Sequence, residues 1–211
     1  MDIAEKTRIR TLTRANVGGD KRIEVLDAAI GVIVKRGFDN TRYADIAEAS
    51  GVAVSTLQYY FGSLESLLIE TCLHASHRDF AAVRERADVL RDPWERLVYL
   101  VEVFMTSEAP GPGWQAQIEY WRAAFTRPHL REELIRDQDR WRSFIADTIR
   151  DGIARGVFTT GRDPDLIAMQ INCQLDGTVF PALAGNPAYD PDAFRAAVID
   201  DLSGILGHHR G

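Results

Sequence analysis

The chain has few cysteines and no long apolar run, and both features restrict what kind of protein it is. Only two of its 211 residues are cysteines, Cys72 and Cys173, and they lie far apart in segments with helical spacing. This excludes a disulfide framework and predicts two reduced thiols. No stretch approaches the roughly 18 consecutive apolar residues that a membrane-spanning helix needs. We therefore expect a cytoplasmic protein with no membrane partner.

The sequence also lacks the patterns of strands and of common enzymes. Apolar residues recur at helical spacing almost everywhere, and no segment shows the sustained alternation of a strand. The expected fold class is therefore all-α. There is no phosphate-binding glycine loop, no HExxH helix and no Gly-x-Ser-x-Gly elbow. We expect no catalytic activity, no bound cofactor and no metal.

Charge is distributed unevenly along the chain. The net charge is −6, yet residues 1–62 hold nine basic and eight acidic side chains, which leaves 16 basic and 23 acidic ones for the rest. Within the first 22 residues the count is six basic to three acidic. The N-terminal part is thus the part best suited to meet phosphates, and the acidity belongs to the C-terminal part.

Sequence signals for helix starts and stops divide the chain. A first helix is expected over 20–36, ended by Gly37, with an apolar stripe of Ile23, Leu26, Ile30 and Ile33. Residues 1–19 lack a stripe and are expected to form a mobile basic arm. Three aspartate–proline pairs predict later helix starts, because aspartate caps a helix and proline suits its first position. These pairs lie at residues 92–93, 163–164 and 190–191. Further helices are expected over about 63–88 and from about 128, and His208 and His209 are expected to be a tail.

Residues 41–64 have the spacing of a helix-turn-helix. A short helix carries Ile46 and Ala47 on its inner face, Gly51 suits the left-handed turn, and a second short helix runs from about Val54 to Tyr60. Val52 and Leu57 are expected to face the core of a three-helix head. The outward side chains of the second helix are rich in hydroxyl and amide groups, which bind phosphates and base edges in a major groove.

These residues resemble the TetR-like family of bacterial one-component repressors. The shared pattern is Thr41, Ile46-Ala47, Gly51-Val52, Thr56-Leu57 and Phe61. The resemblance implies a ligand-responsive repressor that binds palindromic operator DNA as a dimer. It also implies these DNA contacts: phosphates by Thr56, Tyr59 and Tyr60, bases by Val54, Ser55 and Gln58, and the backbone by Arg42 and Tyr43. Leu64 and Ala53 depart from the family's usual lysine and capping residue, so modest affinity is expected, with the basic arm and neighbours such as Arg22 adding to it.

The C-terminal half resembles the branch of that family that includes choline-, betaine- and polyamine-responsive repressors. We expect residues 20–66 to form the DNA-binding domain and 67–211 the effector-binding and dimerisation domain, with the last two helices joining a homodimer. Aromatic and apolar side chains with a few polar groups are the candidate effector contacts: Phe104, Trp114, Ile118, Trp121, Phe125, Trp141, Met169, Gln170 and Cys173. Glu119 or Asp176 near such rings would favour a cationic effector. Ordinary core packing is the competing interpretation for each of these residues.

Two other functions stay open at this stage. His74 and His77 lie three residues apart near Cys72 and Asp79, which is compatible with a metal-sensing regulator of the same fold. A helical adaptor that uses its motif only for protein contacts is the second alternative.

Overall fold

The computed structural model describes residues 3–105 and 112–208, with side chains described from 19 to 105 and from 117 to 208. Within these ranges the regular structure is helical throughout, which confirms the all-α prediction: α1 (Ile3–Arg36), α2 (Tyr43–Ser50), α3 (Val54–Phe61), α4 (Leu64–Asp88), α5 (Pro93–Phe104), α6 (Pro112–Thr126), α7 (Pro128–Ala154), α8 (Pro164–Leu183) and α9 (Pro191–Leu206). The chain divides into two compact units. The N-terminal unit consists of Met1–Ser76 and Gln115–Ala123, and the C-terminal unit consists of His77–Trp114 and Ala124–Gly211.

The first helix departs from the prediction at its start and on one face. It begins at Ile3 rather than near Asp20 and ends as expected before Gly37, whose φ is 80°. Alanine, leucine, lysine and arginine are good helix formers, and Gly18 and Gly19 cost only about 1 kcal/mol each, so the predicted break is wrong. Ile23 is also wrongly placed in the stripe, since it is 49% exposed and Val25 is buried instead.

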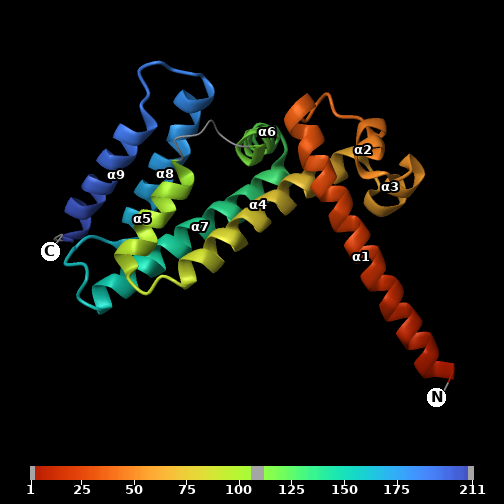
Figure 1. Cartoon of the computed structure of the whole chain (residues 1–211), viewed down its shortest axis with the longest axis horizontal. Coiled ribbons are helices and arrows are strands. Elements are labelled where there is room, and N and C mark those ends of the chain that lie inside the picture. The colour runs from red at the N-terminus through yellow and green to blue at the C-terminus, as the bar shows by residue number, and fades with distance from the viewer. Residues whose placement is uncertain (1–2, 106–111, 209–211) are drawn as a thin grey trace. The chain divides into compact units, whose positions relative to one another are not determined.

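The N-terminal unit is built around a small apolar core. In Figure 1, α2 and α3 lie beside the end of α1 that precedes them. The buried side chains come from α1 and the loop after it, the helix-turn-helix, the first part of α4, and α6: Val25, Leu26, Ala29, Ile30, Ile33, Phe38, Ile46, Val52, Leu57, Phe61, Leu67, Leu68, Cys72, Ala75, Tyr120 and Ala123. Each of the two short helices thus depends on tertiary packing, because a helix of eight residues has little stability alone.

Caps and prolines set the ends of the later helices. Asp92, Asp163 and Asp190 each accept a backbone hydrogen bond from the first turn of α5, α8 and α9, and a proline follows each of them. These three starts and the start of α7 at Pro128 agree with the prediction.

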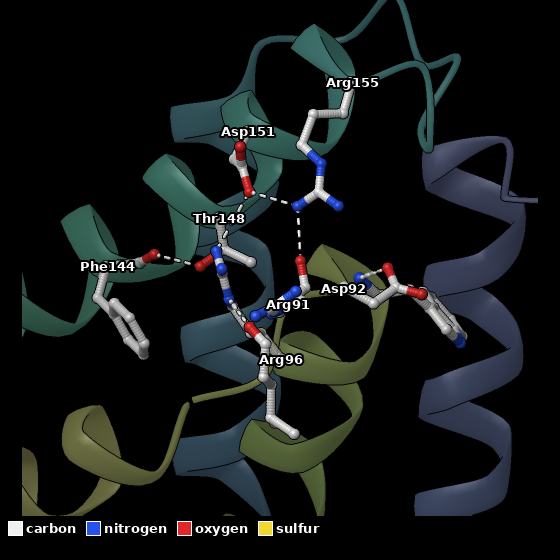
Figure 2. A network of polar contacts seen from close by, with 9 residues as sticks. Arg91, Asp92, Arg96, Phe144, Thr148, Asp151 and Arg155 are labelled. Carbon is white, nitrogen blue, oxygen red and sulfur yellow. Dashed lines mark hydrogen bonds and ion pairs between the residues drawn. The ribbon is translucent and has the colours of Figure 1, made fainter. Parts of the chain in front are cut away.

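The C-terminal unit is a helical bundle with one apolar core, formed by α5, α7, α8, α9 and the later part of α4. A polar network ties the turn before α5 to α7 (Figure 2). Arg96 donates to the Leu90 carbonyl at 2.7 Å and to the Asp151 carboxylate at 3.2 Å. Arg155 donates to the Arg91 carbonyl at 2.6 Å and to Asp151 at 3.2 Å. Charged donors thereby satisfy carbonyls left over at the end of α4.

His208 is part of this unit rather than a tail, so that prediction is wrong. Its ring stacks on Trp94 at 4.4 Å between centroids, and its backbone N–H donates to the Ser203 carbonyl. Gly207, with φ 62°, supplies the left-handed residue that turns the chain back after α9. His209 lies outside the described residues. No helix in the described ranges is both long and apolar enough to cross a membrane.

Candidate nucleic-acid interface and effector region

The helix-turn-helix forms with the predicted spacing. Gly51 takes the left-handed conformation between α2 and α3, with φ 67°. Ile46 and Leu57 are fully buried and Val52 is 7% exposed, so the inner faces of both helices are closed by the core. This leaves one face of α3 free to meet a ligand.

The outward side chains of α3 divide by exposure. Ser55, Gln58 and Tyr59 are exposed, with 85% of Tyr59 accessible. Val54, Thr56 and Tyr60 are half-buried at the edges of the same face. Ala53 provides no side-chain cap at the N-terminus of α3. The three exposed side chains offer a hydroxyl, an amide and a phenol, which suits hydrogen bonding to phosphates and base edges.

The two predicted contacts at the start of α2 are already engaged with the protein. The guanidinium of Arg42 donates to the carbonyls of Asp39 and Thr41 at 3.0 and 3.3 Å, and its backbone N–H donates to Asp45 at 2.9 Å. Burial raises the pKa of Tyr43, whose hydroxyl is enclosed and has no hydrogen-bond partner within the described residues. A phosphate contact by Tyr43 therefore requires its hydroxyl to move, whereas Arg42 is exposed and uses only its Nη1 in these bonds.

Three long-range contacts of the N-terminal unit were not predicted. Glu119 of α6 accepts a hydrogen bond from the backbone N–H of Phe38 at 3.0 Å. Arg122 pairs with Asp39 at 2.7 Å. Arg22 of α1 binds Glu70 of α4. The residues of each pair are 48 to 83 positions apart in the chain, and no local sequence pattern points to such pairs.

The candidate metal ligands do not converge. His74 pairs with Asp27 of α1 at 3.0 Å. Burial, with a smaller effect of the Glu119 charge, raises the pKa of Cys72 to about 12, so this thiol is protonated and a poor ligand. Within the described ranges, no group of three or more His, Cys, Asp or Glu side chains is placed to hold a metal ion. The metal-sensing alternative thus gains no support.

Part of the predicted effector set lies in an aromatic cluster of the C-terminal unit. Trp141 of α7 contacts Phe104 of α5 and Phe80 of α4, with ring centroids 4.9 and 4.7 Å apart and near-perpendicular planes. All three rings are half-buried. Edge-to-face contacts of this kind stabilise a core and also form ligand walls.

The rest of the predicted effector set is dispersed. Met169 and Cys173 lie on an exposed stripe of α8 with Leu166 and Phe180, and Phe125 is 68% exposed. Gln170 accepts a hydrogen bond from Arg162 at 3.1 Å. The half-buried Ile118 and Trp121 belong to the N-terminal unit, and the side chain of Trp114 lies outside the described residues.

The two carboxylates suggested for a cationic effector differ. Glu119 is occupied by the Phe38 N–H and by Arg122, at 3.0 and 3.2 Å. Asp176 in α8 is different, because burial raises the pKa of its carboxyl to about 6. Asp176 is thus the acidic group that would gain most from a cation beside it.

A three-helix head that holds one exposed helix over a closed core, followed by a second helical unit, defines a helix-turn-helix DNA-binding regulator. The chain belongs to the TetR family of bacterial transcriptional regulators. Residues 25–71 match the family described as "Bacterial regulatory proteins, tetR family", and residues 93–207 match "BetI-type transcriptional repressor, C-terminal".

Individual relatives agree with this assignment. The chain is 27% identical to the regulator BetI of Paraburkholderia phymatum. The match covers 53% of this chain and 58% of BetI, so the chain spans a little over half the length of that relative. It is 29% identical to the repressor KstR2 of Mycobacterium tuberculosis, over 70% of this chain and 74% of that one. A regulator from Saccharomonospora viridis, solved in complex with choline, has 29% identity and a TM-score of 0.74, covering 88% of this chain and 96% of the other.

Proposed function

We propose that this protein represses transcription by binding a near-palindromic operator as a homodimer through α3, and that a small molecule releases it. The observation that carries the proposal is the exposed face of α3, where Ser55, Gln58 and Tyr59 project from a helix whose other side is buried. In this proposal residues 20–66 are the DNA-binding domain, 67–211 bind effector and the second subunit, and 1–19 form a basic arm. The protein acts in the cytoplasm by binding rather than by catalysis.

A gel shift with the DNA upstream of its own gene and of the neighbouring genes tests the first step. The proposal expects a shift by one fragment that an unrelated duplex of equal length does not compete away. Equal competition by both duplexes would contradict it, and would favour a helical adaptor whose motif serves protein contacts.

The exposed apolar stripe of α8 supports dimerisation through the last two helices. Leu166, Met169, Phe180 and Leu183 are 40 to 67% exposed, and Phe194 of α9 is 43% exposed. Apolar side chains gathered in this way on soluble proteins mark interaction surfaces. Small exposed residues on α9 allow another helix to approach closely; they are Ala193, Ala197 and Gly204.

A substitution of Phe180 tests this interface. Phe180→Asp places a charge in the proposed contact and should yield a monomer by light scattering. Phe125→Asp is a matched control, because Phe125 is equally exposed at 68% but lies outside α8 and α9. A Phe180→Asp protein that remains dimeric would move the interface elsewhere.

We further propose that the effector is a small molecule bound beside Phe104 and Trp141, and that a cationic effector is favoured. The support is Asp176, whose partly desolvated carboxylate would be stabilised by a cation beside it, together with the choline complex of the Saccharomonospora viridis relative. Calorimetry with choline and with its neutral carbon analogue tests this. The proposal expects heat of binding for choline only, and its loss in Asp176→Asn. Equal binding of the two compounds would exclude recognition of the charge.

A further inference from the structure

We infer that Arg22 is a positioning residue for the recognition helix: it fixes the C-terminal end of α3 to α1 and α4 and does not bind a phosphate. The inference rests on the proposed DNA binding by α3 and deepens it. It also replaces the expectation that Arg22 adds to the basic arm.

Three of the five N–H groups of the Arg22 guanidinium have partners on other elements. Its Nε and Nη2 donate to the two carboxylate oxygens of Glu70 at 2.6 and 2.5 Å, a bidentate pair. Its Nη1 donates to the backbone carbonyl of Tyr60 at 2.5 Å. The guanidinium carbon also lies 4.3 Å from the centroid of the Phe61 ring. One side chain of α1 thereby contacts both the end of α3 and the second turn of α4.

The bond to Tyr60 acts where α3 is weakest. The last carbonyls of a helix have no donor within the helix, and α3 has only eight residues. Gly62 satisfies the carbonyl of Gln58 at 2.9 Å, and Arg22 satisfies the carbonyl two residues later. Bonds from charged donors are stronger than neutral ones, so Arg22 is well suited to hold this turn. Gln58 and Tyr59, the exposed side chains of that turn, depend on it for their direction.

A phosphate contact by Arg22 is the competing role, and the geometry opposes it. A DNA phosphate would have to compete with the bidentate carboxylate of Glu70, whose charge already neutralises the guanidinium, for a side chain that is only 35% exposed. Lys21 lies next to Arg22 and pairs with the exposed Glu24 one helical turn away, and its own side chain is 43% exposed. Lys21 is therefore a suitable comparison for the loss of an accessible positive charge in the same segment.

The two roles predict opposite results for Glu70→Gln. If Arg22 positions α3, Glu70→Gln weakens the clamp and raises the Kd for DNA, as Arg22→Lys does. If Arg22 binds a phosphate, Glu70→Gln frees its charge and lowers the Kd. The probe is the duplex that the wild-type protein selects from a random pool, measured by fluorescence anisotropy over a salt series. A random duplex of the same length serves as the non-specific reference.

We expect Arg22→Lys to raise the Kd for the selected duplex by roughly tenfold and Glu70→Gln to raise it by less, with a smaller change for the random duplex. The slope of log K against log salt should stay unchanged in both and also in Arg22→Met, which removes the positive charge, because no phosphate contact is lost. Loss of one phosphate contact instead reduces that slope by about 0.9, and Lys21→Met shows whether the assay detects such a loss.

Tighter binding by Glu70→Gln, or a reduced salt slope in Arg22→Met, would overturn the inference. If the Arg22 variant does not fold, Glu70→Gln alone decides, since the two roles give it opposite signs. A wild-type protein that selects no duplex at all would overturn the proposed function, and that failure is distinct because it appears before any variant is made.

Discussion

The side chain of Glu119 in α6 accepts a hydrogen bond from the backbone N–H of Phe38, and the two atoms are 3.0 Å apart. Phe38 is the second residue after α1, which ends at Arg36. Arg122, one turn further along α6, binds Asp39 at 2.7 Å. The loop that leads from α1 into the helix-turn-helix is therefore held by a helix that also carries Ile118 and Trp121, two predicted effector contacts. A shift of α6 would thus act on the DNA-binding head directly.

Glu119→Ala should lower the free energy of unfolding by about 1–3 kcal/mol, because the Phe38 N–H loses this acceptor and Arg122 loses a partner. Glu119→Gln keeps an acceptor oxygen and should cost less. Urea unfolding measures both, and Glu48→Ala, an exposed glutamate of α2, should change the value by no more than about 0.5 kcal/mol. Equal losses for Glu119→Ala and Glu48→Ala would show that the contact contributes nothing.

Gly152→Ala should destabilise the C-terminal unit. A Cβ at this position would lie 2.1 Å from two ring carbons of Phe158, which is 2% exposed and has no room to move aside. We expect a loss of about 1–3 kcal/mol in the free energy of unfolding.

Gly31→Ala is the matched control for that substitution. Gly31 also lies within a helix, but no described atom is within 4 Å of its added Cβ, so the variant should be more stable by about 0.5–1 kcal/mol. A neutral Gly152→Ala would mean that the packing of Phe158 against α7 is looser than its burial indicates.

Gln58 and Tyr59 should fail in different ways if one meets bases and the other a phosphate. Gln58→Ala should blur the preference at one position of each half-site, whereas Tyr59→Phe should weaken all duplexes alike. Competition binding against single-position variants of the selected duplex separates the two patterns. Loss of specificity to the same degree in both would contradict the assignment.

Asp176 should make stability depend on pH in the acid range. Burial raises the pKa of its carboxyl from 3.8 to about 6, so the folded protein holds this proton more tightly than the unfolded chain does. Its contribution to stability is then present at low pH and is lost as pH rises from about 4 to about 6. The Asp176→Asn protein does not undergo this loss, so its free energy of unfolding should rise relative to that of the wild type by about 2 kcal/mol between pH 4 and pH 7. A constant difference across that range would show that the carboxyl has its ordinary pKa.

Local signals predicted most helix ends, and the long-range contacts were not predictable from them. Gly37, Gly51 and the aspartate–proline pairs act through their own backbone, so their effect is visible in the sequence. The continuation of α1 to Ile3 was missed because an apolar stripe is not required where helix propensity is high.

The positions that link distant segments needed the structure. Ile23 and Val25 are both apolar, and only packing decides which is buried. Arg22 and Glu119 look like ordinary helix-surface charges in the sequence, although their partners lie 48 and 81 residues away. The predicted effector set combined core aromatics such as Trp141 with exposed residues such as Met169, because helical spacing alone does not separate an interior face from an interface.

In the proposed complex, one dimer places two copies of α3 on one operator. Footprinting of the wild-type protein on the duplex that it selects tests this most directly. We expect two protected half-sites related by two-fold symmetry, with centres roughly 34–36 Å apart along the DNA, and loss of both in Phe180→Asp. A single protected site without symmetry, bound equally well by Phe180→Asp, would contradict it.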